Sequence, residues 1–258
     1  MAYTMLMENS EIQGLYAEIF KRMSVRDYRP GEPDGVDFEK IEEGRKSLIS
    51  LDGSTALLRV IPAEKAGVSF GHAPYCLCSY AKDDEARLKA SFLLQEMSLY
   101  LSTRGFGSCW LGMAKPKNGF LEHESLPFFK LLVFGKAPGA HRRERVSQFK
   151  RKTLSEITDI QNCPKVLEAV RLAPSAMNRQ GWRLCAEGTK IRLYMANNNF
   201  LVKKLMDPLT IVDAGIALCH LWTAARALGI FRASYKEEGV PHIKGFSYVW
   251  TIELTEFK

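Results

Sequence analysis

Two stretches near the start of the chain return in its second part, in the same order. Phe20-Lys21-Arg22-x-Ser24-Val25 resembles Phe149-Lys150-Arg151-x-Thr153-Leu154, 129 residues further on. A second set, Leu99, Arg104 and Gly107, matches Leu221, Arg226 and Gly229 at a shift of 122. Such self-similarity indicates a repeated structural unit. The chain is therefore expected to form two pseudo-symmetric halves, residues 1–140 and 141–258, packed intimately as one unit.

Apolar periodicity predicts helices and strands in a similar order in both halves. Helices are predicted over 11–23, 38–49, 84–104, 164–173 and 210–228. Strands are predicted within 54–63, 74–81, 105–114, 127–137, 230–236 and 246–254, and a hairpin over 182–196 with its turn at Glu187–Gly188. The Gly-, Pro- and Arg-rich stretch 135–152 is the expected connector. This predicts an α+β fold in which each half is a mixed β-sheet packed by helices.

Composition limits the functional classes. With 46% hydrophobic and 25% charged residues, the 258-residue chain is an ordinary globular one. No apolar run approaches the ~20 residues of a membrane span, and no signal peptide is recognisable, so a cytoplasmic location is expected. The six cysteines lack zinc spacing, which predicts reduced structural thiols and no metal site. Among the histidines, His220 lies on an apolar helix and is expected to be a packed core residue.

The net charge of +7 suits a phosphate-bearing ligand or nucleic acid. The densest basic run, residues 141–152, has Phe149 as its one aromatic residue and so lacks a stacking platform. Nucleic-acid binding is therefore not expected. By composition alone, the run is more typical of a solvated linker.

Three segments carry candidate chemistry. Arg22, Ser24 and Arg26 alternate after a helix, and two guanidiniums with a hydroxyl suit an anion, although a solvated helix end looks similar. In Ala173–Trp182, Pro174 stops a helix and polar groups follow on a tight turn, as in many helix–strand connections. In Arg104–Met113, glycines allow close approach of backbone to a flat ligand, but a helix C-cap also explains them.

Taken together and in this order, the three segments resemble the nitroreductase family of FMN-dependent oxidoreductases. They look most like its single-chain tandem branch, in which one chain mimics the usual two-subunit dimer. The resemblance spans about Tyr16 to Ser234 and is carried by SVRDY, GFGSCWLG, KRKTLSEI and LAPSAMNRQGW.

The resemblance implies a role for each segment. Arg22 and Ser24 would face the FMN phosphate and ribityl, and Arg26 the N1/O2 edge of the flavin, where it is the candidate catalytic residue. The backbone of Leu111 and Gly112 would pass flavin N5. The remaining implied FMN contacts are a phosphate-gripping basic cluster, Lys150, Arg151 and Lys152, and a segment reaching across from the other half, Pro174, Ser175, Ala176 and Asn178.

The chain also departs from the family pattern. Gln180-Gly181-Trp182 stands where the family often has Q-P-W. The first half has EGRKSLISL (43–51) where the second has APSAMN, and the second half has TLSEI (153–157) where the first has SVRDY. Each half has thus kept the part of the site that the other lost. This predicts one complete pocket and one FMN per chain, in a protein that acts as a monomer, with a homodimer still possible.

The resemblance further implies a ping-pong reaction. NAD(P)H would reduce the flavin, and a small electron acceptor such as a nitroaromatic or quinone would reoxidise it. Alternatives are another flavin reaction, such as reductive dehalogenation or flavin breakdown, and a non-catalytic or sensory flavin-binding protein.

Overall fold

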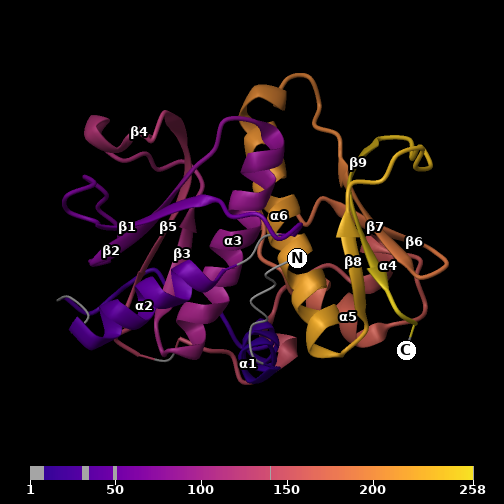
Figure 1. Ribbon diagram of the computed structural model, residues 1–258, viewed down its shortest axis with the longest axis horizontal. Coiled ribbons are helices and arrows are strands. Elements are labelled where there is room, and N and C mark those ends of the chain that lie inside the picture. Colours follow the sequence, from indigo (N-terminus) through magenta and orange to yellow (C-terminus); the bar gives the residue numbers. More distant parts are fainter. Residues whose placement is uncertain (1–8, 31–34, 49–50, 140, 258) are drawn as a thin grey trace, which may run out of the picture.

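Two β-sheets stand on either side of a central pair of long helices (Figure 1). The computed structural model describes residues 9–30, 35–48, 51–139 and 141–257. The helices in these ranges are α1 (Asn9–Ile19), α2 (Gly35–Ser47), α3 (Asp84–Thr103), α4 (Leu154–Ile157), α5 (Pro164–Arg171) and α6 (Lys203–Ala227). The predicted end of the second helix, Ile49, lies outside the described residues.

The first sheet contains β1 (Leu57–Pro62), β2 (Tyr75–Tyr80), β3 (Gly107–Leu111) and β5 (Leu126–Gly135), with the short β4 (Glu122–His123) paired to β5. The second contains β6 (Trp182–Glu187), β7 (Lys190–Ala196), β8 (Phe231–Tyr235) and β9 (Phe246–Leu254). Their strand orders are β1-β2-β5-β3 and β6-β7-β9-β8. In both sheets a hairpin leads into the long helix, and the last strand inserts between the second and third. The two sheets therefore share one topology.

The expectation of mixed sheets is wrong for the paired strands. Every ladder between the named strands is antiparallel. The second and third strands of each half do run in the same direction, as a helical crossover requires. The last strand lies between them, however, and pairs antiparallel with both. In the described residues, parallel pairing is limited to the isolated bridges Ser24–Ser108 and Thr158–Leu184.

The long helices α3 and α6 pack against each other in the middle of the molecule, and α1 contacts both. One apolar core runs through the two halves, including Phe92 of α3 against Trp222 of α6 with ring centroids 5.6 Å apart. A second, smaller core lies on the outer face of the first sheet. Because α3 and α6 come from different halves, neither half buries its helical face alone.

The helix α6 differs from its prediction in extent and hydropathy. It begins seven residues before the predicted start at 210, and Pro208 lies inside it. By length and composition α6 could cross a membrane, so the expectation that no such stretch exists is corrected. Of that apolar window, 83% is buried inside the structure, as in the core helix of a globular protein.

Candidate functional site

A cavity of about 450 Å³ lies between the two halves, within the range of small-molecule sites. Six of the sequence-predicted residues line it: Ser24, Arg26, Gly112, Pro174, Ser175 and Ala176. The prediction did not include the other lining residues: Cys109, Trp110, Met113, Met177, Leu205, Met206, Leu209, Val212, Asp213 and Ile216. The cavity therefore joins the first-half segments around Ser24 and Gly112 to the loop after α5 and the start of α6.

The first-half wall is formed by the segment after α1, which lies along the edge strand β3. The Val25 amide donates to the Ser108 carbonyl at 3.0 Å, and Ser24 forms a parallel bridge with Ser108. A Cβ at Gly107 would lie 2.4 Å from Val25 Cγ2, so the absence of a side chain there permits this close approach. The contact places Ser24 and Arg26 on the cavity.

Arg26 presents an uncompensated positive charge to this cavity. The residue is exposed and lines the cavity wall. Within the described part of the chain, its side chain makes no hydrogen bond or ion pair. Since guanidinium groups stay charged at any working pH, Arg26 is available to a negatively charged or electron-rich ligand edge.

The second-half wall is the loop 174–180, whose backbone is held in an unusual conformation. Met177, Asn178 and Gln180 have positive φ angles of 52°, 56° and 45°, which cost energy for residues with a side chain. The Ser175 hydroxyl accepts the Gln180 amide at 2.9 Å, and the buried Gln180 side chain donates to the Arg171 carbonyl at 2.8 Å. Strain of this kind concentrates at ligand sites, and these bonds fix the loop against the cavity.

Asp213 is a buried acid of the cavity wall that the sequence prediction did not include. It lies on α6, is 3% exposed, and its Oδ1 accepts the Ala176 amide at 2.8 Å. Burial raises the pKa of Asp213 to about 7, against the lowering effect of that hydrogen bond and of the Arg179 charge. A single acid within the apolar stretch Thr210–Leu218 was the available signal.

Three arginines gather beside the cavity, behind the two segments that form its walls. Arg22 is 5% exposed, and its Nη2 has no hydrogen-bond partner among the described residues. Burial, together with the Arg151 and Arg143 charges, lowers the pKa of Arg22 to about 10. Burial and the charges of Arg143 and Arg171 do the same for the pKa of Arg151. A buried arginine with an unused donor, beside two half-buried arginines, forms a site that suits an anion.

Arg143 joins this cluster by packing rather than by sequence pattern. Its guanidinium lies 4.2 Å from the centre of the Phe149 ring, and its Nη1 donates to the Arg22 carbonyl at 2.6 Å. It belongs to the basic run that composition alone assigned to a solvated linker. The basic run 141–152 therefore contributes Arg143 to the arginine cluster.

The remaining predicted residues lie behind the cavity or away from it. The Asn178 side chain accepts from Arg151 Nη1 at 2.5 Å and donates to the Lys150 carbonyl at 2.8 Å. The Lys152 amide donates to Gln180 Oε1 at 2.8 Å, and the Lys150 side chain is exposed. Leu111 pairs with Leu131 and packs on the second core. Asn178 and Lys152 thus tie the 150–152 segment to the loop 174–180 rather than lining the cavity.

His220 is the packed core residue that its apolar surroundings predicted. Its Nδ1 lies 2.8 Å from the Ala169 carbonyl, and its Nε2 lies 3.0 Å from Gln95 Nε2. Burial lowers the pKa of His220 to about 3, so the ring is neutral, donates from Nδ1 and accepts from Gln95. Gln95 Oε1 accepts from Trp110 Nε1 at 3.1 Å. This network crosses both halves and fixes Trp110 in the cavity wall.

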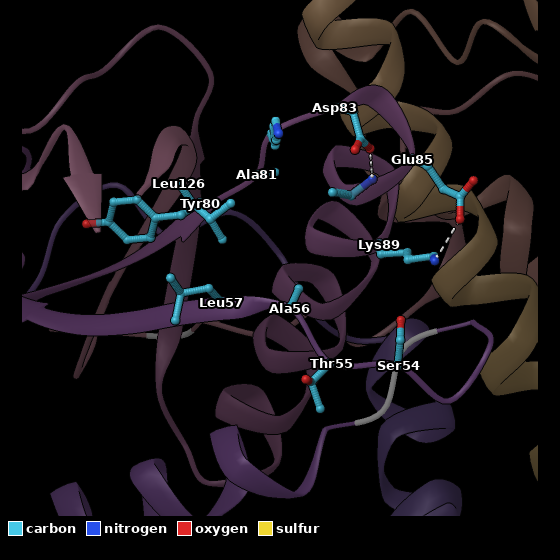
Figure 2. A pocket seen from close by; sticks show the side chains of 12 residues that line it. Ser54, Thr55, Ala56, Leu57, Tyr80, Ala81, Asp83, Glu85, Lys89 and Leu126 are labelled. Atoms are coloured by element: carbon cyan, nitrogen blue, oxygen red, sulfur yellow. Dashed lines mark hydrogen bonds and ion pairs between the residues drawn. The ribbon is translucent and has the colours of Figure 1, made fainter. Parts of the chain in front are cut away.

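A second, larger cavity of about 740 Å³ lies at one end of the first sheet (Figure 2). It is lined by Ser54–Leu57, Tyr80–Asp83, Glu85, Ala86, Lys89 and Leu126, none of them a predicted site residue. Its Lys89 is bound by Asp52 at 2.7 Å and Glu85 at 2.8 Å. Because the predicted site residues line the cavity between the halves and not this one, we take the cavity between the halves as the candidate site.

Comparison with known proteins agrees with the architecture. Residues 14–225 match the sequence model of a family described as "Putative TM nitroreductase". A solved Thermotoga maritima protein, described as a "putative nitroreductase", is 21% identical with a TM-score of 0.66, covering 95% of this chain and 94% of its own. At that identity the match shows a shared fold. A search of curated protein sequences gave no match.

Two further solved proteins match a smaller part of the chain. A Desulfitobacterium hafniense nitroreductase with bound FMN is 16% identical, covers 49% of this chain and 90% of its own, and has a TM-score of 0.39. An FMN-dependent nitroreductase from Mycobacterium smegmatis, in complex with NADPH, is 13% identical, covers 59% of this chain and 99% of its own, and has a TM-score of 0.45.

Proposed function

Because the chain belongs to the "Putative TM nitroreductase" family, we propose that it is an FMN-dependent oxidoreductase. In this proposal NAD(P)H gives electrons to FMN held between the halves, and a small acceptor such as a nitroaromatic or a quinone takes them. The observation that carries the proposal is one arrangement: a cavity between the halves, with the unpaired Arg26 on its wall and the Arg22 cluster behind it.

The described residues fit FMN at both of its ends. The unpartnered Nη2 of Arg22, beside Arg143 and Arg151, is a donor set suited to a phosphate. The cavity offers the ring an apolar wall of Leu209 and Ile216 and the hydroxyl of Ser24. Bound FMN supplies the redox chemistry, since it exchanges hydride and electrons with its two substrates.

The protein's own contribution is charge and shape. Arg26 would hold a positive charge beside a flavin bound in this cavity, and a preorganised charge of this kind would stabilise the negative reduced ring. The loop 174–180 is held rigidly by the Ser175 and Gln180 hydrogen bonds, so it fixes one face of the cavity. Because donor and acceptor would use the same cavity, they bind in turn.

A visible spectrum tests this proposal. The purified chain, supplied with FMN, is expected to show a bound-flavin spectrum, to melt at a higher temperature, and to be bleached by NADH or NADPH under anaerobic conditions. The acceptor then restores the colour. Absence of any FMN-dependent shift in melting temperature contradicts the proposal. Binding without bleaching points instead to the non-catalytic flavin protein.

We also propose one FMN per chain. The counterpart of Ser24 in the second half, Thr153, is occupied in a capping box, where its amide and hydroxyl bond Glu156 at 2.8 and 2.9 Å. Arg45, in the segment that replaces APSAMN, is paired with Glu42 at 2.8 Å. The opposite site thus has Ser155 where the first has the free Arg26. Equilibrium titration is expected to saturate at one equivalent, and two equivalents of similar affinity contradict the half-site argument.

A further inference from the structure

Asp213 faces the candidate cavity with half of its carboxyl group uncommitted. It lies on α6 among Leu209, Val212 and Ile216, and all four residues line the cavity. The hydrogen bond from the Ala176 amide engages Oδ1. Among the described residues, no other hydrogen bond or ion pair reaches this carboxyl group. Its second oxygen, Oδ2, therefore remains available to a bound molecule.

The charged and titratable groups around Asp213 are few. Arg26 and Cys109 line the same cavity from the first half, and Arg179 lies in the loop 174–180, whose Ala176 amide bonds the carboxyl. Burial raises the pKa of the Cys109 thiol above its ordinary value, so this group is neutral at working pH. Neither arginine forms an ion pair with Asp213 within the described chain. Burial therefore favours the neutral acid and outweighs the Arg179 charge, which favours the carboxylate.

We propose that Asp213 is the proton donor to the acceptor substrate bound in this cavity, an inference that rests on the proposed function. Reducing a quinone to a hydroquinone takes two electrons and two protons. The electrons and one proton come as hydride from the reduced cofactor. The O–H bond of Asp213 breaks, and its proton forms an O–H bond on the acceptor oxygen. The Asp213 carboxylate is then reprotonated by solvent.

The same cavity selects the acceptor class. Met113, Met177 and Leu205 line it and are 71%, 75% and 54% exposed, so they form an open apolar rim. Flexible methionine side chains adapt to flat apolar surfaces. A neutral, planar, apolar acceptor suits this rim and also leaves Asp213 protonated. An anionic acceptor would have a favourable contact only with Arg26.

The test compares wild type with Asp213→Asn, which keeps an oxygen acceptor for the Ala176 amide but cannot titrate. Holoenzyme is reduced anaerobically with one equivalent of dithionite and mixed with tetramethyl-1,4-benzoquinone from pH 5 to pH 9. Wild-type reoxidation is expected to be fast at low pH and to fall above about pH 7. Asp213→Asn is expected to be about 100-fold slower at pH 6 and independent of pH, as for loss of a general acid.

A stability measurement supplies a readout that does not depend on turnover. Asp213 is protonated in both folded and unfolded chains below its ordinary pKa. As pH rises from about 4 to about 7 only the unfolded chain loses this proton, so the folded state loses stability, and above about 7 the loss is complete. The melting temperature of the wild type as purified should therefore fall, relative to Asp213→Asn, across this window. Asp84→Asn, at an exposed position of α3, is the matched control and should follow wild type in both measurements.

The outcomes separate the inference from its premise. A wild-type protein that binds FMN and is reduced, but is reoxidised at the same rate and with the same pH profile as Asp213→Asn, overturns the proton-donor role alone. A wild-type protein that binds no FMN, or whose reduced form does not pass electrons to the quinone, overturns the proposed function and this inference with it.

Discussion

Replacing Arg22 with methionine is expected to weaken FMN binding about 10- to 100-fold while leaving the flavin-free chain as stable as wild type or more so. The buried Nη2 of Arg22 has no partner in the described residues, and burial together with the neighbouring cations lowers the pKa of this guanidinium. Without an anion the charge is therefore unfavourable, and methionine removes it at similar volume. With a phosphate bound, the loss is a charged hydrogen bond, about 1.5–3 kcal/mol.

This prediction is specific because Arg22→Met should weaken FMN binding without lowering the stability of the flavin-free chain. Adding Arg151→Met should lower affinity further, to about 1000-fold below wild type if the two contacts are equally strong. Arg232→Met changes net charge equally but alters an exposed arginine on β8, so it should bind FMN normally. Isothermal titration gives the affinities and thermal melting the stabilities. If Arg22→Met destabilises the flavin-free chain and leaves affinity unchanged, Arg22 is a structural residue and the phosphate site lies elsewhere.

Much of the fold followed from apolar periodicity because the local signals agree with the tertiary structure. The helix predicted over 84–104 is α3, and the strand predicted within 246–254 is β9. Both segments are strongly patterned and lie in the core. The start of α6 was predicted too late because Pro208 normally interrupts a helix. The hairpin turn lies at Gly188–Thr189, one residue past the prediction. The ladder pairs Glu187 with Lys190, so Glu187 belongs to the strand, and Gly188 adopts the positive φ angle of 55° in the turn.

The sequence could predict site segments but not all of the side chains that face the cavity. Ser24, Gly112 and Ala176 line the cavity because the predicted segments that contain them form its walls. Asn178 was expected at the flavin, but its side chain turns back to the 150–152 segment. That direction depends on a positive φ angle, which no local pattern specifies.

Asp213 and Arg143 were missed for a different physical reason. Asp213 acquires its significance from burial between two halves, which depends on the packing of α6. Arg143 stands in a polar run and is recruited by the face of Phe149. Both effects arise from tertiary contacts between distant segments. The properties of Asp213 and Arg143 that matter to this site therefore depend on tertiary packing, and the local sequence does not show them.

Replacing Arg26 with alanine is expected to slow reduction of bound flavin by about 30- to 1000-fold, about 2–4 kcal/mol, with little change in the free energy of unfolding. Arg26 is exposed, lines the cavity, and has no partner within the described residues. Its removal therefore breaks no internal contact and leaves no cavity in a core. What is lost is the positive charge on the cavity wall, and under the proposed function that charge matters most when the bound flavin becomes negative.

The design of the measurement separates charge from binding. Stopped-flow reduction by NADH or NADPH at saturating FMN gives the rate, and FMN titration gives the affinity. Arg26→Lys should recover part of the rate, since it keeps the charge but not the planar fork of donors. Arg29→Ala, three residues along the same exposed loop and absent from the cavity lining, should match wild type. Unchanged reduction and unchanged FMN affinity in Arg26→Ala would remove this residue from the site. If Arg26→Ala lowers the reduction rate and the FMN affinity by the same factor, Arg26 is a binding residue and does not act specifically on the reduced flavin.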